Sequence, residues 1–345
     1  MKPAAAPRDD RDQTRLLVLD PCGGERQDAR IAELPSYLQP GDLVVVNDAA
    51  TLPGSLRAQT VSGQELELRL AGPSDDDRLW VVAFGPGDYH TRTEERAAPP
   101  PLAAGDTLHI GPRLRARVLE RSAISPRLLK LGCSLAGAAL WAELYARGMP
   151  VQYQHHDRDL GLWSVQTAYA ARPWAAEMPS AGRPLSFATL HALQRRGVRL
   201  ASLTHAAGIS ATGDAALDAA LPLPERYDIP LATVRALDTA RRVIAVGTSV
   251  VRALEGSAAK GGGVTPGLDV TELRIGPGFV PRVVTGLLTG MHSPGESHYA
   301  LLRAFASEPQ LTAASEHAER AGYLSHEFGD VTLVLAGTLG QMRRA

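Results

Sequence analysis

The stretch VIAVGTSVVRALE, residues 243–255, joins a short apolar run to a helical pattern through a single glycine. A buried strand is expected to end at Gly247, and a helix follows at once. Thr248 or Ser249 can cap that helix, and the free backbone N–H groups of its first turn can hold an anion, with Arg252 one turn further on. A strand–turn–helix unit without a ligand explains the same pattern. In both cases the stretch indicates an α/β fold.

Strands and helices alternate through most of the chain outside residues 55–148. Strands are expected at 15–20, 43–46, 198–205, 243–247, 270–275 and 330–337, and helices at 186–197, 231–242, 248–258 and 298–306. The buried strand 43–46 ends in a polar loop opened by Asn47, which is where α/β proteins tend to place sites. Residues 1–15 are polar and rich in Pro and Ala, and we expect a loose arm there.

Residues 55–148 differ from the rest of the chain in their periodicity. Five short runs of nearly alternating polarity are separated by Gly, Pro and Asp: ELELRL (65–70), RLWVVAF (78–84), DTLHI (106–110), LRARVLE (114–120) and RLLKL (127–131). Such runs predict an antiparallel meander or small barrel. The expected fold is therefore an α/β main domain, with a mixed sheet and flanking helices, formed by residues 1–54 and 149–345. An antiparallel β-barrel domain, residues 55–148, is inserted into it.

Composition restricts the class of protein. The 345 residues include 36 basic and 37 acidic side chains, a net charge of −1, so a nucleic acid could be bound only through a local basic patch. No stretch of about 18 apolar residues could span a membrane, and the N-terminus lacks the apolar core of a signal peptide. Cys22 and Cys133 have neither metal-ligand nor redox spacing. We expect a cytoplasmic protein without structural disulfides.

Histidines suggest two further candidate sites. In TGMHSPGESH, His292 ends an apolar run and opens a Pro-Gly loop, where an imidazole can act as acid or base near neutral pH. A solvated loop before a helix explains that pattern equally well. In YQHHDRD, neighbouring residues on a strand would point to opposite faces, so His155, His156 and Asp157 are not expected to share a metal ion. We expect no metal site.

Seven ordered blocks resemble the S-adenosylmethionine:tRNA ribosyltransferase-isomerases, the enzymes that build the epoxycyclopentane ring of queuosine. They are PGDLVVVND (40–48), VQTAYA (165–170), MPSAG (178–182), ERYDIP (225–230), VIAVGTSVVRALE (243–255), PGFVPRVVTGLLTGMHSPGES (277–297) and GYLSHEFGD (322–330). These blocks cover most of the chain from about residue 16 onward. The inserted β segment also stands where this family carries its barrel.

The resemblance implies that S-adenosylmethionine is a co-substrate that donates its ribosyl moiety. The acceptor would be 7-aminomethyl-7-deazaguanine in tRNA, and the products epoxyqueuosine, adenine and methionine; no metal or redox cofactor is implied. Carried over to matching positions, the candidate catalytic residues are His292, Asp330 and Glu225. The candidate substrate-binding residues are Asn47, Gln166, Thr167, Tyr169, Gly247, Thr248, Ser249 and Arg252. We expect them to meet in one cleft at the strand ends.

Several motif positions differ from the family's pattern. Ala50 stands in place of an arginine, Arg183-Pro184-Leu185 in place of Leu-His-Phe, and Phe328 in place of a tyrosine. Three functions therefore stay open. The first is the family reaction on tRNA. The second, favoured by the near-zero net charge and the missing arginine, is ribosyl transfer to a small deazapurine or another acceptor. The third is a catalytically inactive binding protein.

Overall fold

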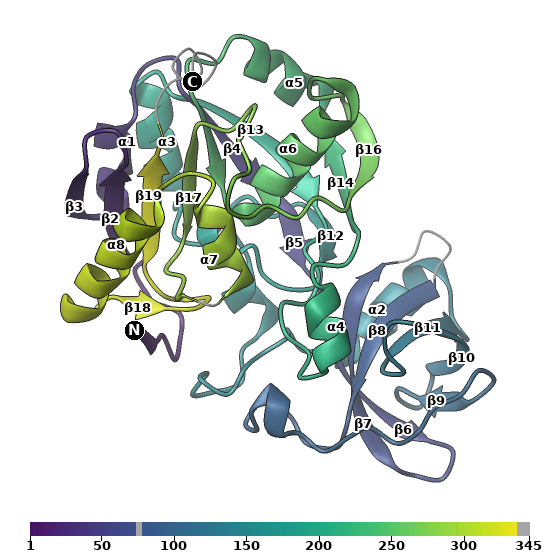
Figure 1. The fold of residues 1–345 in the computed structure, drawn as a ribbon. Coiled ribbons are helices and arrows are strands. Elements are labelled where there is room, and N and C mark those ends of the chain that lie inside the picture. Colours follow the sequence, from purple (N-terminus) through teal and green to yellow (C-terminus); the bar gives the residue numbers. More distant parts are fainter. Residues whose placement is uncertain (74–77, 295, 337–345) are drawn as a thin grey trace.

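The computed structural model describes residues 1–73, 78–294 and 296–336, which form a nine-stranded sheet flanked by helices and a separate closed barrel (Figure 1). In spatial order the sheet contains β16 (Gly267–Thr271), β14 (Glu225–Ile229), β13 (Arg199–His205), β4 (Leu43–Asn47), β15 (Val243–Val246), β17 (Gly286–Gly290), β19 (Val331–Leu335), β2 (Arg15–Asp20) and β3 (Glu25–Arg30). The four central strands β13, β4, β15 and β17 are mutually parallel, and the other strands include antiparallel partners. The expected mixed sheet is confirmed.

Both faces of the main sheet are buried, which explains why its central strands are continuous apolar runs. In β4, Leu43 and Val45 point to one face and Val44 and Val46 to the other. The first face is covered by α6 (Thr248–Gly261), α7 (Ser297–Leu302) and α8 (Glu308–Arg320), and the second by α1 (Leu34–Tyr37) and α3 (Phe187–Arg195). Helix α5 (Leu231–Asp238) packs beside β13.

The second sheet closes into a barrel of six antiparallel strands, and this confirms the fold class expected for the inserted segment. Its strands are β6 (Ser55–Thr60), β7 (Glu65–Pro73), β8 (Arg78–Phe84), β9 (Thr107–His109), β10 (Arg115–Arg121) and β11 (Leu128–Cys133). The five alternating runs became β7 to β11, whereas β6 was missed although it closes the barrel between β7 and β9. Helix α2 (Gly137–Arg147) buries Leu140 and Leu144 against the barrel core.

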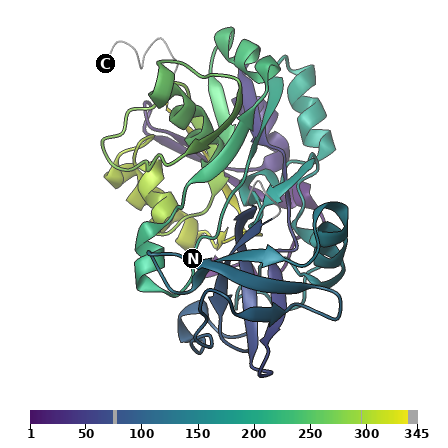
Figure 2. The same cartoon turned by 90° about the vertical axis from the view of Figure 1, so that its right-hand side faces the viewer.

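The barrel lies at one end of the main domain in both views (Figures 1 and 2). The chain enters and leaves it side by side, because Ser55 and Met149 exchange two backbone hydrogen bonds of 2.8 and 2.9 Å. Such a double connection is typical of an inserted domain. We therefore propose the division into residues 1–54 with 149–345 and an inserted 55–148.

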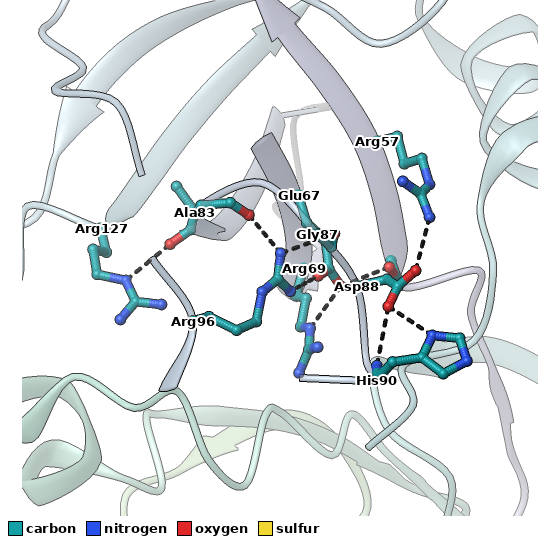
Figure 3. A network of polar contacts seen from close by, with 11 residues as sticks. Arg57, Glu67, Arg69, Ala83, Gly87, Asp88, His90, Arg96 and Arg127 are labelled. Carbon is teal, nitrogen blue, oxygen red and sulfur yellow. Dashed lines mark hydrogen bonds and ion pairs between the residues drawn. The ribbon is translucent and has the colours of Figure 1, made fainter. Parts of the chain in front are cut away.

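A buried ionic network on the barrel side faces the main domain (Figure 3). Arg69 donates a hydrogen bond of 2.7 Å from Nε to Glu67, and Arg96 pairs with the same carboxylate. The Arg69 guanidinium also lies 5.6 Å from the ring centre of Tyr153, whose hydroxyl donates a hydrogen bond to Glu177. The two parts of the molecule therefore meet here through a cation–π contact.

The N-terminal segment is not the loose arm that was expected. β1 (Lys2–Pro3) pairs in parallel with β18 (Leu324–Ser325), and Arg8 forms an ion pair of 2.8 Å with Asp330. That expectation was wrong because composition does not reveal partners 322 residues away in the sequence. No helix in the described ranges is both long and apolar enough to cross a bilayer.

Candidate functional site

Three neighbouring parallel strands end at the same edge of the main sheet. β4 pairs with β15, and β15 pairs with β17. Asn47 is the last residue of β4, Gly247 directly follows β15, and His292 follows β17 by two residues. Open α/β sheets bind their ligands at this edge.

Asn47 joins three of the elements that meet there. Its side chain is buried and donates hydrogen bonds to the carbonyl of His205 (3.0 Å) and to Ser249 Oγ (3.3 Å). Its Oδ1 accepts from the backbone N–H groups of His205 (2.9 Å) and Ala49 (3.1 Å). Asn47 therefore fixes the ends of β4 and β13 against the first turn of α6.

Gly247 occupies the turn between β15 and α6 with φ of 91°, a conformation that favours glycine. Helix α6 begins at Thr248, so Thr248 and Ser249 both lie inside its first turn. The expectation that one of them caps the helix was wrong, since Gly247 holds the cap position and no side-chain cap is formed among the described residues. The N–H groups of this turn therefore remain available to a ligand.

A buried polar cluster lies one helical turn further on. Arg252 of α6 places Nη1 2.7 Å from Oε2 of Glu225, the first residue of β14. His205, the last residue of β13, places Nε2 3.2 Å from the same oxygen. Glu225 Oε1 accepts a hydrogen bond of 2.9 Å from the N–H of Gly208. His205 is a site candidate that the sequence analysis did not select, although its place at a strand end was a usable signal.

Several atoms of this cluster are buried without a hydrogen bond to any described residue. They are Nη2 of Arg252, Oε2 of Glu225 and both ring nitrogens of His205. The two contacts to Oε2, from Arg252 and His205, are short but lack the angles of hydrogen bonds. Buried polar atoms in native proteins are normally satisfied. The cluster is therefore suited to a polar ligand that completes these bonds.

Burial dominates the charge states of the cluster. It raises the pKa of Glu225 above its ordinary value, although Arg252 and the Gly208 N–H oppose the shift. Burial, with a smaller contribution from the charge of Arg252, lowers the pKa of His205 to about 3. His205 is therefore neutral near pH 7, and Glu225 holds a proton more readily than an exposed carboxylate.

His292 lies in the loop after β17 and is largely buried. Its Nε2 is 2.9 Å from Thr289 Oγ1, and its Nδ1 is 3.4 Å from Glu296 Oε2. Its ring stacks on that of His298 at 5.0 Å between ring centres. Thr289 and Glu296 therefore orient the ring from both of its nitrogens.

The charges of His292, in the loop after β17, and of Arg252, in the Glu225 cluster, both affect His298. Burial lowers the pKa of His298 to about 4, and the charges of His292 and Arg252 lower it further. The structure thus brings together Asn47, Ser249, Glu225 and Arg252 through direct contacts or shared neighbours, and it places His292 against His298. That His292 shares one cleft with the other four stays a prediction.

The VQTAYA block contacts β5 (Ala49–Thr51), the short strand that follows Asn47. The Gln166 side chain exchanges hydrogen bonds of 2.9 and 3.0 Å with the backbone of Thr51, so it anchors a strand there. Thr167 is buried, and its hydroxyl has no hydrogen bond to the described residues. Burial and the charge of Asp48 raise the pKa of Tyr169. Thr167 therefore has a hydroxyl left for a ligand, while binding roles for all three residues stay predictions.

Asp330 is occupied by protein groups. Oδ1 accepts a hydrogen bond of 2.9 Å from the N–H of Arg15 and pairs with Arg8, and Oδ2 accepts 2.8 Å from the N–H of Leu324. These contacts are typical of a residue that positions the N-terminal segment. Its catalytic role remains a prediction that no contact here supports.

Two replaced motif positions touch each other. Arg183 is buried, donates a hydrogen bond of 2.9 Å from Nε to the carbonyl of Ser164, and places its guanidinium 4.9 Å from the ring centre of Phe328. Burial first, then the neighbouring Arg11 and Arg8, lower the pKa of Arg183 to about 10. Arg183 and Phe328 therefore form a cation–π pair close to Asp330.

The YQHHDRD segment is a turn and not a strand. His155 and His156 both approach the carboxylate of Glu327, whereas Asp157 is exposed beside Arg158. The argument that adjacent residues face apart therefore does not hold for these two histidines.

Comparison with known proteins gives the family. The family model for queuosine biosynthesis protein matches residues 2–334. An S-adenosylmethionine:tRNA ribosyltransferase-isomerase of Acidithiobacillus ferrooxidans is 33% identical over 96% of this chain and 94% of its own, and one of Sorangium cellulosum is 36% identical over the same shares. The crystal structure of an S-adenosylmethionine tRNA ribosyltransferase from Thermotoga maritima shares the fold, with a TM-score of 0.52 at 24% identity and 96% of each chain covered. The chain therefore belongs to the queuosine biosynthesis protein family, whose named members are transferase-isomerase enzymes.

Proposed function

We propose that this protein transfers the ribosyl moiety of S-adenosylmethionine to 7-aminomethyl-7-deazaguanine in tRNA and isomerises it to epoxyqueuosine. Adenine and methionine are released, and the reaction takes place in the cytoplasm, where tRNA is modified. The relatives named for this activity match the chain over nearly its full length. The observation that carries the proposal is the buried Glu225–Arg252–His205 cluster with its unsatisfied polar atoms at the strand ends.

The cluster is chemically suited to the co-substrate. S-adenosylmethionine presents a carboxylate, an amine, a ribose and adenine, and a buried arginine with an N–H that no described residue accepts can hold the carboxylate or a hydroxyl. The first turn of α6 offers backbone donors beside it. Glu225, with a raised pKa, can give a proton to departing adenine.

We assign general acid–base catalysis to His292. A sulfonium group acidifies the neighbouring ribose carbon and is a good leaving group, so a base beside that carbon begins the reaction. His292 has polar partners at both ring nitrogens and remains partly accessible. We assign Asp330 and Gln166 to positioning, because their side chains hydrogen-bond backbone groups and so hold chain segments in place.

A local basic stripe on the barrel supports tRNA as the acceptor. Arg115, Arg117 and Arg121 of β10 are all exposed, and strand geometry places Arg115 and Arg117 on the same face. The net charge of −1 requires such a local patch for phosphate binding.

Mass spectrometry of the products from S-adenosylmethionine tests the proposal. The reaction is run with tRNA bearing the deazaguanine precursor, with the free deazapurine, and with neither. Adenine, methionine and modified tRNA in the first reaction alone are expected. Consumption of the free deazapurine would assign the protein to a small-molecule acceptor. Absence of adenine from all three would make it an inactive binding paralogue.

A further inference from the structure

Three potential metal ligands from two distant segments meet beside the candidate site. One ligand atom each from His155, His326 and Glu327 lies within 4.8 Å of the other two. His155 Nε2 is 2.8 Å from Glu327 Oε2, and the rings of His155 and His326 are 4.5 Å apart between centres. His155 belongs to the segment that leaves the barrel, whereas the other two lie between β18 and β19. The fold therefore creates a grouping that local sequence does not show.

His326 is held in an unusual backbone conformation. Its φ is 67°, and it is the one non-glycine residue in the described ranges with positive φ. A histidine in this region costs free energy relative to ordinary backbone, and such residues gather at functional sites. The conformation keeps the imidazole of His326 beside that of His155.

His156 provides a second, independent indication of a ligand. Its side chain is 2% exposed, and its Nδ1 accepts a hydrogen bond of 3.2 Å from the N–H of Tyr153, so Nε2 carries the proton. That Nε2 is buried without a hydrogen bond to any described residue and lies 3.6 Å from Glu327 Oε2. A buried N–H that faces a carboxylate is the usual outer partner of a metal-binding carboxylate.

We propose that His155, His326 and Glu327 bind a divalent transition-metal ion, with His156 positioning the carboxylate. Two imidazoles and one carboxylate form a donor set used by zinc and iron, and three protein ligands leave coordination positions for water or substrate. Ligand atoms of a tetrahedral zinc site are about 3.3 Å apart, given bonds of about 2.0 Å. The three ligand atoms lie within 4.8 Å of one another, and rotation of the side chains would bring them to that spacing. A bound ion would displace the proton of the hydrogen bond between His155 Nε2 and Glu327 Oε2.

The ion would join two segments that border the candidate site. The 326–330 segment is tied to the His292 loop, because the N–H of Met291 donates a hydrogen bond of 3.2 Å to the carbonyl of Asp330. A metal at Glu327 would therefore fix the segment against which the His292 loop rests. This inference is independent of the proposed function, since it concerns binding and not turnover.

Calorimetry with Zn²⁺ on the full chain tests the proposal. The protein is purified without a histidine tag, stripped with a chelator and titrated. One Zn²⁺ per chain with Kd below about 10 µM is expected. At a hundredfold excess over Kd, Tm should rise by about 3–4 °C for a chain of this length. Co²⁺ should give visible absorption bands typical of mixed nitrogen and oxygen ligands.

Variants distinguish Zn²⁺ binding at this site from nonspecific Zn²⁺ binding by exposed histidines. Glu327→Gln, which keeps the shape of the side chain, and His326→Gly, which suits the left-handed backbone, should each weaken Zn²⁺ binding at least 100-fold. His156→Ala should weaken it by about 10- to 100-fold, as expected for an outer partner. His191→Ala, at an exposed position of α3, is the matched control and should bind as the parent does. Unchanged affinity in Glu327→Gln and His326→Gly, or no stoichiometric binding by the parent, overturns the proposal.

Discussion

Arg252 and Glu225, which are 27 residues apart on α6 and β14, place Nη1 and Oε2 2.7 Å from each other in a buried site. Removing one partner leaves an uncompensated group, and breaking buried pairs costs about 3–5 kcal/mol of unfolding free energy. We expect that loss in Arg252→Met and in Glu225→Gln, measured by urea unfolding. The double variant should lose less than the sum of the two.

In this set of two single variants and one double variant, enzymatic activity should change differently from the free energy of unfolding. If the pair binds the co-substrate, the double variant will regain stability but release no adenine. A double variant that is as active as the parent would assign the pair a purely structural role.

The buried histidines predict a loss of stability in weak acid. The pKa of His205 is lowered to about 3 and that of His298 to about 4, both chiefly by burial. Below about pH 6.5 the histidines bind protons in the unfolded chain but not in the folded chain. The stability present above about pH 6.5 is therefore lost as the pH falls toward the pKa values of the folded state. Each histidine contributes up to about 1.4 kcal/mol per pH unit.

Urea unfolding at pH 7.5, 6.0 and 5.0 measures this dependence. His205→Asn should reduce the slope by about one proton, whereas His191→Asn, at an exposed position, should leave it unchanged. Equal slopes in the parent and His205→Asn would contradict a neutral buried His205.

Gly182 leaves room for the hydroxyl of Tyr169. A Cβ at residue 182 would lie 2.0 Å from Tyr169 Oη but 3.2 Å from the ring carbon that bears it. Gly182→Ala should therefore cost about 1–3 kcal/mol of unfolding free energy. Tyr169→Phe in the same chain should restore most of it, because the clashing oxygen is gone. If the double variant is no more stable than Gly182→Ala, the clash lies elsewhere.

The sequence was informative wherever periodicity and burial agree. The run LVVV before Asn47 is apolar on both faces, as a strand covered by helices on both sides must be, and it became β4. The alternating runs of the inserted segment likewise became barrel strands. By contrast, SLRAQT at 55–60 lacks enough apolar positions to reveal β6, which is fixed by its two neighbours in the barrel.

The candidate site was only partly accessible from the sequence. Strand ends directed attention to Asn47, Gly247 and His292, because each stands directly after an apolar run or close to its end. The partnership of His155 with Glu327 could not be found in this way, since 172 residues separate them and neither lies on a regular element. Local patterns do not encode which loops meet in space.

The basic stripe on β10 should contribute to tRNA affinity. Each arginine that contacts a phosphate adds close to one unit to the slope of log Kd against log salt concentration. The double variant Arg115→Gln/Arg117→Gln should weaken tRNA binding and reduce that slope by about 1–2. Arg26→Gln/Arg195→Gln, at exposed positions of the main domain, is the control of equal charge. Equal effects of the two double variants would point to net charge alone and not to a binding face.

His292 is expected to move a proton in the reaction, and its surroundings allow that role to be distinguished from substrate binding. Its Nε2 contacts Thr289 and its Nδ1 faces Glu296, so the ring is oriented by protein groups. His292→Ala should lower turnover by about 10²–10⁴-fold, the usual contribution of a positioned acid or base, while the Kd for S-adenosylmethionine changes little. Thr289→Val, which removes one orienting contact, should lower turnover less and leave the same Kd.

Adenine release in single turnovers and calorimetry with S-adenosylmethionine measure the two quantities. A parallel loss of affinity and turnover in His292→Ala would make His292 a ligand contact, because only a group that acts in the transition state lowers the rate without weakening binding.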